Sequence, residues 1–430
     1  MDPPRSALRP RDRIRDLRHP LLLPGNGAVA STFRGLRHRN FRLWFFGQLT
    51  SLVGTWMQTI AQNWLVYQLT GSARDLGLVN FVGAIPLVPL TLYAGAIADR
   101  FEKRKVIFWC QAAMMVLAFL LAALCWTGTV RFWHVLLLAF LLGAVQALDT
   151  PARQAFVVEL VGKEDLSNAI ALNSGAFHAA RVLGPAVAGV LIAVSGVAGA
   201  FFINGASFLA VLFGLFLMDV ALIRRTGAGH ESAKDLLGGV RYLRKERLPR
   251  AVVVLISLSA LFAMPYHVLI PIYAREIFGR GAGGYGVLMS AAGVGAVLGS
   301  LYSASHRVGG SKGAAITAGS LTFPVLLLAF AFCRSYPAAI LLLVGVGFAF
   351  VVQNAPANSL LQELVPDHLR GRVMAIYVSL FLGFLRVGSL LLGVLAARTS
   401  APAALAALAV AGLLVGLWVR FRYPELHRSA

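Results

Sequence analysis

The amino-acid sequence predicts an all-α membrane protein whose twelve transmembrane helices form two six-helix halves related by internal duplication. Three observations predict this class: the composition, the number of long apolar runs, and a repeat between the two halves of the chain. Hydrophobic residues make up 58% of the 430 residues and charged residues only 13%, about half the roughly 25% typical of soluble domains. This composition excludes a water-soluble enzyme, a disordered chain and a disulfide-stabilised domain.

Long apolar runs define the expected helices. A helix crosses the hydrocarbon core in about 20 predominantly apolar residues, with its backbone polar groups paired within the segment. We expect one transmembrane helix in each of twelve runs: 43–69, 76–98, 106–128, 133–151, 167–192, 199–220, 251–274, 284–304, 314–333, 338–361, 373–397 and 402–420.

The positively charged residues predict the orientation. With both termini inside, the inner segments hold 31 of the 39 Lys and Arg residues and the outer loops hold six, while Arg181 and Arg386 lie within runs. Cytoplasmic loops are enriched in Lys and Arg, so we expect both termini in the cytoplasm and the chain in a cell inner membrane. The net charge of +21 then reflects orientation and attraction to anionic lipid, and no nucleic-acid partner is expected.

A repeat supports the division into halves. Asp149-Thr-Pro-Ala recurs as Asn354-Ala-Pro-Ala, Glu159 as Glu363, and Arg181 as Arg386, at offsets of 204 or 205 residues. Duplicated halves predict a substrate path at their interface near the membrane midplane. The expected organisation is a basic cytoplasmic tail at 1–42, an N-terminal half at 43–220, a cytoplasmic linker at 221–250, a C-terminal half at 251–423 and a cytoplasmic C-terminus at 424–430.

Two motifs resemble those of a known transporter superfamily. The segment Gly-Ala-Ile-Ala-Asp-Arg-Phe-Glu-Lys-Arg-Lys at 95–105 resembles the signature loop of the major facilitator superfamily. Arg-Val-Leu-Gly-Pro-Ala-Val-Ala-Gly at 181–189 resembles the glycine–proline motif of its drug/proton antiporters, and Asp-Thr-Pro-Ala-Arg-Gln-Ala at 149–155 is similar to the branch that contains enterobactin exporters. The resemblance implies the major facilitator fold and efflux of a siderophore or drug-like molecule.

Within the signature loop, Gly95 permits close approach of two helix ends, and Asp99 is an acid in a strongly basic loop. Asp99 could accept hydrogen bonds from a facing helix N-terminus or pair with Arg104. The resemblance implies that Gly95, Asp99, Arg100 and Arg104 form a cytoplasmic latch between the halves. The alternative is that the basic residues only enforce orientation.

The glycine–proline motif and the two arginines within runs are the next candidates. Pro185 after Gly184 removes a helix hydrogen bond, and Gly189 adds a small-residue face for packing. An arginine in the middle of a membrane helix is costly unless it faces water or a partner. Arg181 and Arg386 could therefore bind an anionic substrate group or guide a proton, although a buried structural pairing would also explain them.

Polar residues within the runs are the remaining candidates for the cavity or for coupling. Gln58 and Gln62 follow Thr55 at helical spacing, and such a stripe must face inward in lipid. His178 lies one turn from Arg181, and Asp149 is an acid at the inner end of its run. The full set is Gln58, Gln62, Asp149, His178, Arg181, Tyr266, His267, Gln353, Asn354 and Arg386; for each of them a structural hydrogen bond or charge pair is the alternative.

These observations predict a secondary active exporter, driven by the proton gradient, of a bulky and partly apolar small molecule. Proton-coupled uptake on the same fold and a non-transporting membrane sensor are the alternatives. The sequence contains no ATP-binding loop and no His-Glu-x-x-His motif, which argues against ATP-driven transport and an intramembrane enzyme. The cysteines all lie in apolar runs, so no metal or disulfide framework is expected; we expect a monomer without cofactors.

Overall fold

The computed structural model describes residues 33–86, 90, 101–162, 164–223, 236–305 and 311–428, which are helical apart from short turns. In the first half these are η1 (Arg34–Arg37), α2 (Arg39–Thr70), α3 (Ala73–Val82), α5 (Lys103–Trp126), α6 (Phe132–Val161), α7 (Leu166–Phe216) and η2 (Val220–Leu222). In the second half they are α8 (Leu236–Lys245), α9 (Arg247–Phe262), η4 (Met264–Val268), α10 (Ile270–Ile272), η5 (Tyr273–Ile277), α11 (Ala282–Ser305), α12 (Lys312–Ala331), α13 (Tyr336–Leu364), α14 (Asp367–Arg398), α15 (Ala401–Arg422) and α16 (Pro424–Arg428).

The helices account for the predicted spans. Nine segments of the described chain are long and apolar enough to cross a membrane, and one of them is the 51-residue α7. The chain reverses inside α7 at Gly196, whose φ of 69° lies in the left-handed region that glycine occupies without steric cost; α7 therefore supplies the fifth and sixth spans. The first predicted span corresponds to α2, which is long enough to cross a membrane but is less apolar than the nine segments because it carries the polar stripe. The described part of the second predicted span begins with α3.

The seventh span differs from its prediction. The run 251–274 was expected to form one continuous helix, but α9 ends at Phe262 and is followed by η4, α10 and the π-helical η5. Pro265 and Pro271 lie in this stretch, and each removes a backbone donor that a continuous helix would need. The break presents Tyr266 and His267 on a short 3₁₀ turn instead of a regular helix.

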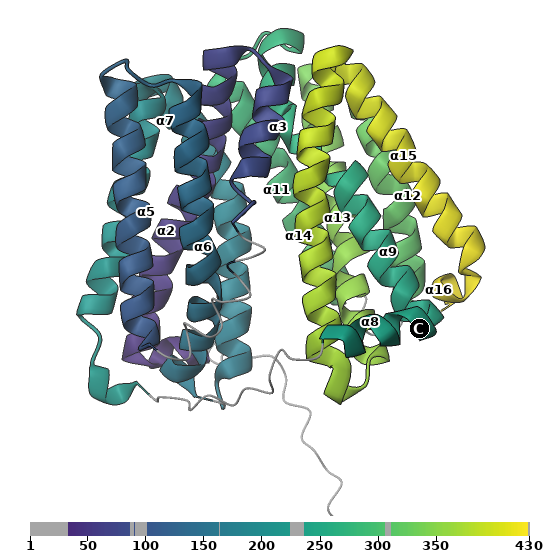
Figure 1. Ribbon diagram of the computed structural model, residues 1–430, viewed down its shortest axis with the longest axis horizontal. Helices are drawn as coiled ribbons and strands as arrows, with labels where there is room; N and C mark the ends of the chain where they lie inside the picture. The colour runs from purple at the N-terminus through teal and green to yellow at the C-terminus, as the bar shows by residue number, and fades with distance from the viewer. Residues whose placement is uncertain are drawn as a thin grey trace, which may run out of the picture.

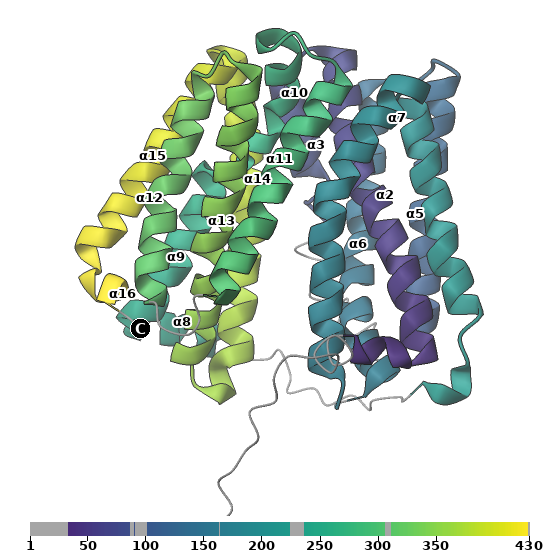
Figure 2. The ribbon, with the colours of Figure 1, turned by 180° about the vertical axis from the view of Figure 1, so that it is seen from behind.

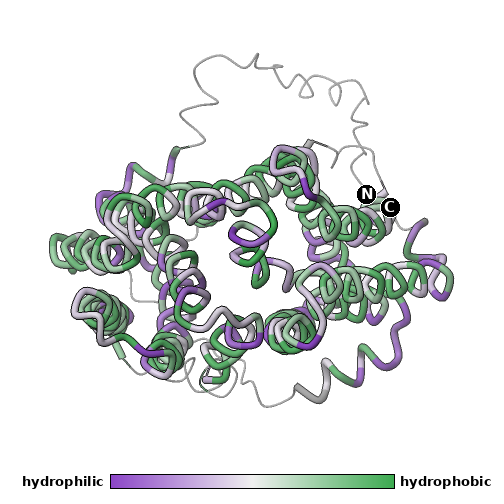
Figure 3. Tube along the Cα trace, turned by 90° about the horizontal axis from the view of Figure 1, so that it is seen from above, coloured by the Kyte–Doolittle hydropathy of each residue, from purple (hydrophilic) through white to green (hydrophobic). Residues whose placement is uncertain are grey.

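The two halves form separate helix bundles that lie side by side (Figures 1 and 2). We call the end of the molecule that carries the start of α2 and the C-terminal α16 the terminal end, and the opposite end the distal end. The bundles meet mainly where α3 packs on α14 and α7 packs on α11. Seen along the helices, both bundles surround a central region (Figure 3).

Glycines make the contact between the halves close. A Cβ on Gly77 of α3 would lie 2.5 Å from the carbonyl oxygen of Ser389 on α14, and one on Gly189 of α7 would lie 3.2 Å from Cα of Gly283 on α11. Small residues let membrane helices approach to this distance. The helix pairs that join the halves are thus in backbone contact.

One ion pair recurs in both halves at the terminal end. Lys103, the first residue of α5, lies 2.7 Å from Glu159 near the end of α6, and Lys312, the first residue of α12, lies 2.5 Å from Glu363 near the end of α13. The two pairs join equivalent helix ends in the two halves. The repeat seen in the sequence is thus a repeat of contacts as well.

Candidate functional site

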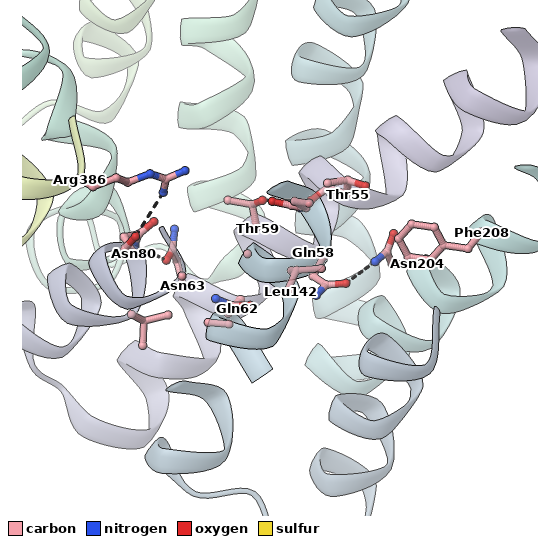
Figure 4. A pocket seen from close by; sticks show the side chains of 15 residues that line it. Thr55, Gln58, Thr59, Gln62, Asn63, Asn80, Leu142, Asn204, Phe208 and Arg386 are labelled. Carbon is pink, nitrogen blue, oxygen red and sulfur yellow. Dashed lines mark hydrogen bonds between the residues drawn. The ribbon is translucent and has the colours of Figure 1, made fainter. Parts of the chain in front are cut away.

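A polar cavity of about 120 Å³ lies among α2, α3, α6 and α7 of the first half and Arg386 of the second; Figure 4 shows its lining side chains. Most of its lining belongs to the first half, and Arg386 of α14 closes it from the second half. Polar side chains predominate because α2 turns its amide and hydroxyl stripe toward it. The polar lining residues are Thr55, Gln58, Thr59, Gln62, Asn63, Asn80, Gln146, Asn204 and Arg386.

Hydrogen bonds fix several of these side chains. The Asn204 amide donates to Gln58, and the Asn80 amide donates to Oδ1 of Asn63 at 3.0 Å. Arg386 in turn donates through one terminal nitrogen to the carbonyl oxygen of Asn80 at 3.4 Å. A chain of contacts therefore runs from α2 through α3 of the first half to α14 of the second half, as Figure 4 shows.

Arg181 lies between aromatic rings from both halves. Its guanidinium carbon is 5.8 Å from the ring centre of Trp56 on α2 and 5.6 Å from that of Phe350 on α13. Both distances are within the range of cation–π attraction. Arg181 makes no ion pair with a described acid, so its charge is held by ring faces only.

The broken seventh span brings Tyr266 and His267 toward the arginines. The positive charge of Arg181 acts electrostatically on Tyr266, and the charges of Arg181 and Arg386 both act on His267. The ring of Tyr266 packs edge-on against Phe323, and Nδ1 of His267 lies 2.9 Å from the carbonyl oxygen of Met264. The described centre of the protein is therefore basic and aromatic.

Of the ten predicted residues, Gln58, Gln62 and Arg386 line the cavity; Arg181, Tyr266 and His267 lie outside its lining, and so do four others. Asp149 of α6 faces α5, where Gln111 donates to its Oδ1 at 3.2 Å, and its Oδ2 is 2.8 Å from Nε of Arg153. Gln353 accepts a hydrogen bond from Ser259 at 3.3 Å inside the second bundle, and Asn354 donates to Phe350 on its own helix. Nδ1 of His178 is buried without a partner among the described atoms.

Most of the expected latch, namely Gly95, Asp99 and Arg100, lies outside the described residues. Arg104 is described, and its Nε donates to the carbonyl oxygen of Leu215 at 2.9 Å. That contact lies within the first half. Arg104 therefore stabilises its own bundle in this conformation.

The glycine–proline motif serves packing between helices. The backbone of α7 stays helical through Pro185. A Cβ on Gly184 would lie 3.0 Å from the carbonyl oxygen of Val53 on α2, and a Cβ on Gly286 of α11 would lie 2.5 Å from that of Pro185. The motif thus joins α7 to α2 on one side and to the second half on the other.

The distal end holds a closure that the sequence did not indicate. Tyr67 of α2 donates a hydrogen bond to Glu276 of η5, and the guanidinium of Arg275 lies 5.8 Å from the Tyr67 ring centre. Next to them, Trp64 stacks on Tyr285 of α11 with ring centres 6.0 Å apart. Ser290 of α11 donates a hydrogen bond to the carbonyl oxygen of Val182 on α7 at 3.0 Å and so joins the halves nearer the middle of the molecule.

Sequence reasoning also missed Asn80 and Asn204 of the cavity. Each is a single amide in an apolar run, which was a usable signal because a polar side chain in a membrane helix must face a partner or a cavity. Trp56 and Phe350 gave no such signal, because aromatic residues are equally common on lipid-facing surfaces. Their role follows only from their position around Arg181.

Comparison with known proteins extends over nearly the whole chain. The sequence profile of the transmembrane secretion effector family of the major facilitator superfamily matches residues 30–429. The chain is 24% identical to the staphyloferrin A transporter of Staphylococcus aureus, over 83% of this chain and 89% of the relative. It is 28% identical to the multidrug efflux pump Tap of Mycolicibacterium fortuitum, over 86% and 93%.

A further relative and a solved structure agree with these matches. The chain is 25% identical to the enterobactin exporter EntS of Shigella boydii, over 91% of this chain and 93% of the relative. The crystal structure of the nucleoside transporter NupG covers 90% of this chain and is itself covered completely, with a TM-score of 0.70 at 13% identity. At that identity the likeness concerns the fold alone.

Proposed function

Because the chain belongs to the transmembrane secretion effector family of the major facilitator superfamily, and is thus a multi-pass membrane transporter and not an enzyme, we propose that it exports a small molecule. The molecule is bulky and partly apolar, such as a siderophore or a drug-like compound, and the proton gradient drives its efflux. Relatives named as an enterobactin exporter and a multidrug efflux pump support export over uptake.

The observation that carries this proposal is the position of the polar cavity relative to the contacts between the halves. The cavity lies at the edge of the first bundle and reaches the second bundle at Arg386. The hydrogen bond of Tyr67 with Glu276 and the stacking of Trp64 on Tyr285 join the bundles on its distal side. A site of this kind is accessible from one side at a time when two repeats rock against each other. Substrate enters from the terminal end and leaves after the distal contacts break.

The size of the cavity supports a substrate that is held between moving halves. Its volume of about 120 Å³ is below the roughly 300 Å³ at which drug-sized pockets begin. A bulky substrate therefore requires the cavity to widen as the two halves move apart.

The protein is oriented in the membrane with both chain termini on the cytoplasmic side. The terminal end faces the cytoplasm of a bacterial inner membrane, with the tail at 1–42, the linker at 221–250 and the C-terminus at 424–430 on that side. Its basic residues contact anionic lipid, and the protein works as a monomer. Each six-helix half moves as a unit during transport.

For coupling, Asp149 is the acid best placed to carry the proton. It is 1% exposed and lies within a span, and its pairing with Arg153 gives its protonation a structural consequence. Gln111 holds the other carboxylate oxygen. Protonation of Asp149 would release Arg153 and alter the contact between α5 and α6.

The test is accumulation of a siderophore and a panel of dyes in inverted membrane vesicles with an imposed pH gradient. We expect at least one compound to accumulate, and a protonophore to abolish the accumulation. Accumulation that survives collapse of the gradient would remove proton coupling. Accumulation in right-side-out vesicles only would reverse the direction, and none in either would favour a sensor.

A further inference from the structure

The polar cavity contains amide side chains that are already paired with one another. The Asn204 amide donates to Gln58, and the Asn80 amide donates to Asn63. Both pairs join neighbouring helices of the first half, as polar side chains within membrane helices commonly do. These four residues therefore have a structural role even when the cavity holds no ligand.

Other side chains that line the same cavity keep most of their hydrogen-bonding groups free. Gln62 of α2 and Gln146 of α6 are half-buried, and their amide groups make no hydrogen bond with any described residue. Arg386 of α14 donates to the carbonyl oxygen of Asn80 at 3.4 Å (Figure 4), and its Nε is buried without a partner among the described atoms. One cavity thus receives uncommitted polar groups from α2, α6 and α14, and so from both halves.

The chemistry of these free groups favours one kind of ligand. An amide both donates and accepts hydrogen bonds, and a hydroxyl group does the same, so Gln62 and Gln146 match hydroxyl groups. A guanidinium only donates and is always charged, which matches a carboxylate. No acid is among the described residues that line the cavity, so the lining repels a cationic group.

We propose that the cavity binds a hydroxycarboxylate group of the exported molecule, with the carboxylate on Arg386 and the neighbouring hydroxyl groups on Gln62 and Gln146. This inference rests on the proposed export function and specifies the polar end of its substrate. The volume of about 120 Å³ suits such a group, whereas a whole drug-sized molecule needs a larger pocket. Because the ligand contacts α2 and α6 of the first half and α14 of the second, its binding holds the two halves together at the cavity.

Binding is measured on the purified full-length protein in nanodiscs, with Cys110, Cys125 and Cys333 replaced by Ala and with Leu142→Cys as a reporter. Leu142 is an apolar lining residue, so its substitution removes none of the proposed contacts. Uncharged N-ethylmaleimide labels the new thiol, and a ligand in the cavity slows the labelling. The probe is D-glycerate; glycerol keeps the hydroxyl groups without the charge, and propionate keeps the charge without the hydroxyl groups. At equal ionic strength, we expect glycerate to protect the thiol at an about tenfold lower concentration than either, the effect of one charged hydrogen bond.

Substitutions in the lining assign the two ends of the probe. Arg386→Gln should abolish the preference for glycerate over glycerol and keep the preference over propionate, whereas Gln62→Leu and Gln146→Leu should do the reverse. Arg398→Gln and Gln362→Leu remove an exposed arginine and an exposed amide outside the cavity lining, and should change neither preference. The labelling rate without ligand shows whether each variant keeps the cavity open to the reagent.

A conservative variant covers a failure of Arg386→Gln to fold: Arg386→Lys keeps the charge and should retain part of the preference for glycerate over glycerol. Equal protection by the three compounds, no protection by glycerate, or unchanged preferences in all the lining variants would each overturn the hydroxycarboxylate proposal. If a dye or siderophore still accumulates in vesicles in that case, the export function stands. If glycerate protects the thiol but nothing accumulates, the export function fails instead.

Discussion

On α6 the buried carboxylate of Asp149 pairs with the half-buried Arg153, with 2.8 Å between the carboxylate and Nε. Removing one partner of a fully buried pair costs about 3–5 kcal/mol, and because 27% of the Arg153 side chain is exposed, removing Asp149 costs less than that. The equivalent positions of the second half hold Asn354 and Asn358, which are neutral. The second half thus shows that two amides fit this place in the fold.

The first prediction concerns this pair. Asp149→Asn should abolish gradient-driven efflux and lower the unfolding temperature, because Arg153 loses its partner. The double variant Asp149→Asn with Arg153→Asn copies the second half and should regain the unfolding temperature but not the efflux. Vesicle transport and a thermal-unfolding assay measure the two effects; efflux at the wild-type rate in the double variant would remove Asp149 from the coupling mechanism.

The two central arginines could be predicted from the sequence, but the residues around Arg181 could not. Arg181 and Arg386 stand out in the sequence because charge in the middle of a span is costly, and both lie at the centre of the structure. The neighbours of Arg181 could not be predicted, because Trp56 and Phe350 come from helices that no local pattern joins to α7. Asp149 was grouped with the cavity residues, yet it faces α5, because the sequence does not specify which side of α6 meets which neighbour.

Among the elements, the spans were the most predictable part. Spans can be read from apolar runs because a helix in lipid must pair its own backbone groups. The runs predicted twelve spans in an all-α membrane protein, and the fold confirms this class. The interruption of the seventh span was missed although Pro265 and Pro271 mark it. Proline in a membrane helix is often tolerated without a break, so its effect depended on packing against the neighbouring helices.

The contact of α3 with α14 leads to the second prediction. A Cβ on Gly393 would lie 2.5 Å from the carbonyl oxygen of Ala73, whereas a Cβ on Gly383 of the same helix meets nothing within 4 Å. Gly393→Ala should therefore push the halves apart at the distal end and slow transport severalfold, while Gly383→Ala should leave transport intact. Vesicle transport rates at equal membrane abundance decide this; equal rates in the two variants would contradict the close contact.

On the scale of the whole molecule, the terminal end is held together by charge as well as by apolar packing. Asp165, in the turn between α6 and α7, lies 2.8 Å from Nε2 of His38 and 2.9 Å from Nε of Arg34. The hydrogen bond with His38, followed by the nearby arginines, holds the pKa of the Asp165 carboxyl below its usual range. The ionised carboxylate therefore ties the segment before α2 to the α6–α7 turn.

The third prediction follows from the direction of this shift. Because the pKa is lower in the folded protein than the roughly 3.9 of an unfolded chain, the carboxylate stabilises the fold above about pH 4 and loses this effect as the pH falls through the folded value. Asp165→Asn should lower the unfolding temperature at pH 7 and should no longer differ from wild type in strong acid. Asp367→Asn, which removes an exposed surface pair with Arg370, should have little effect at either pH.

The movement of the two halves is tested most directly by water access to the cavity. In a protein whose Cys110, Cys125 and Cys333 are replaced by Ala, Gln62→Cys and Asn80→Cys place thiols in the cavity lining. Tyr67→Cys with Glu276→Cys, in the same background, adds two thiols at the distal end. An impermeant and reducible bifunctional thiol reagent, applied from the distal side, joins them across the halves. An impermeant maleimide is applied to inverted and to right-side-out vesicles.

With the distal end cross-linked, we predict labelling of Gln62→Cys and Asn80→Cys from the terminal side only, and loss of transport that a reductant restores. Without the cross-link, turnover of substrate should add labelling from the distal side. Equal labelling from both sides in the cross-linked protein, or undiminished transport, would contradict a central site that opens to one side at a time.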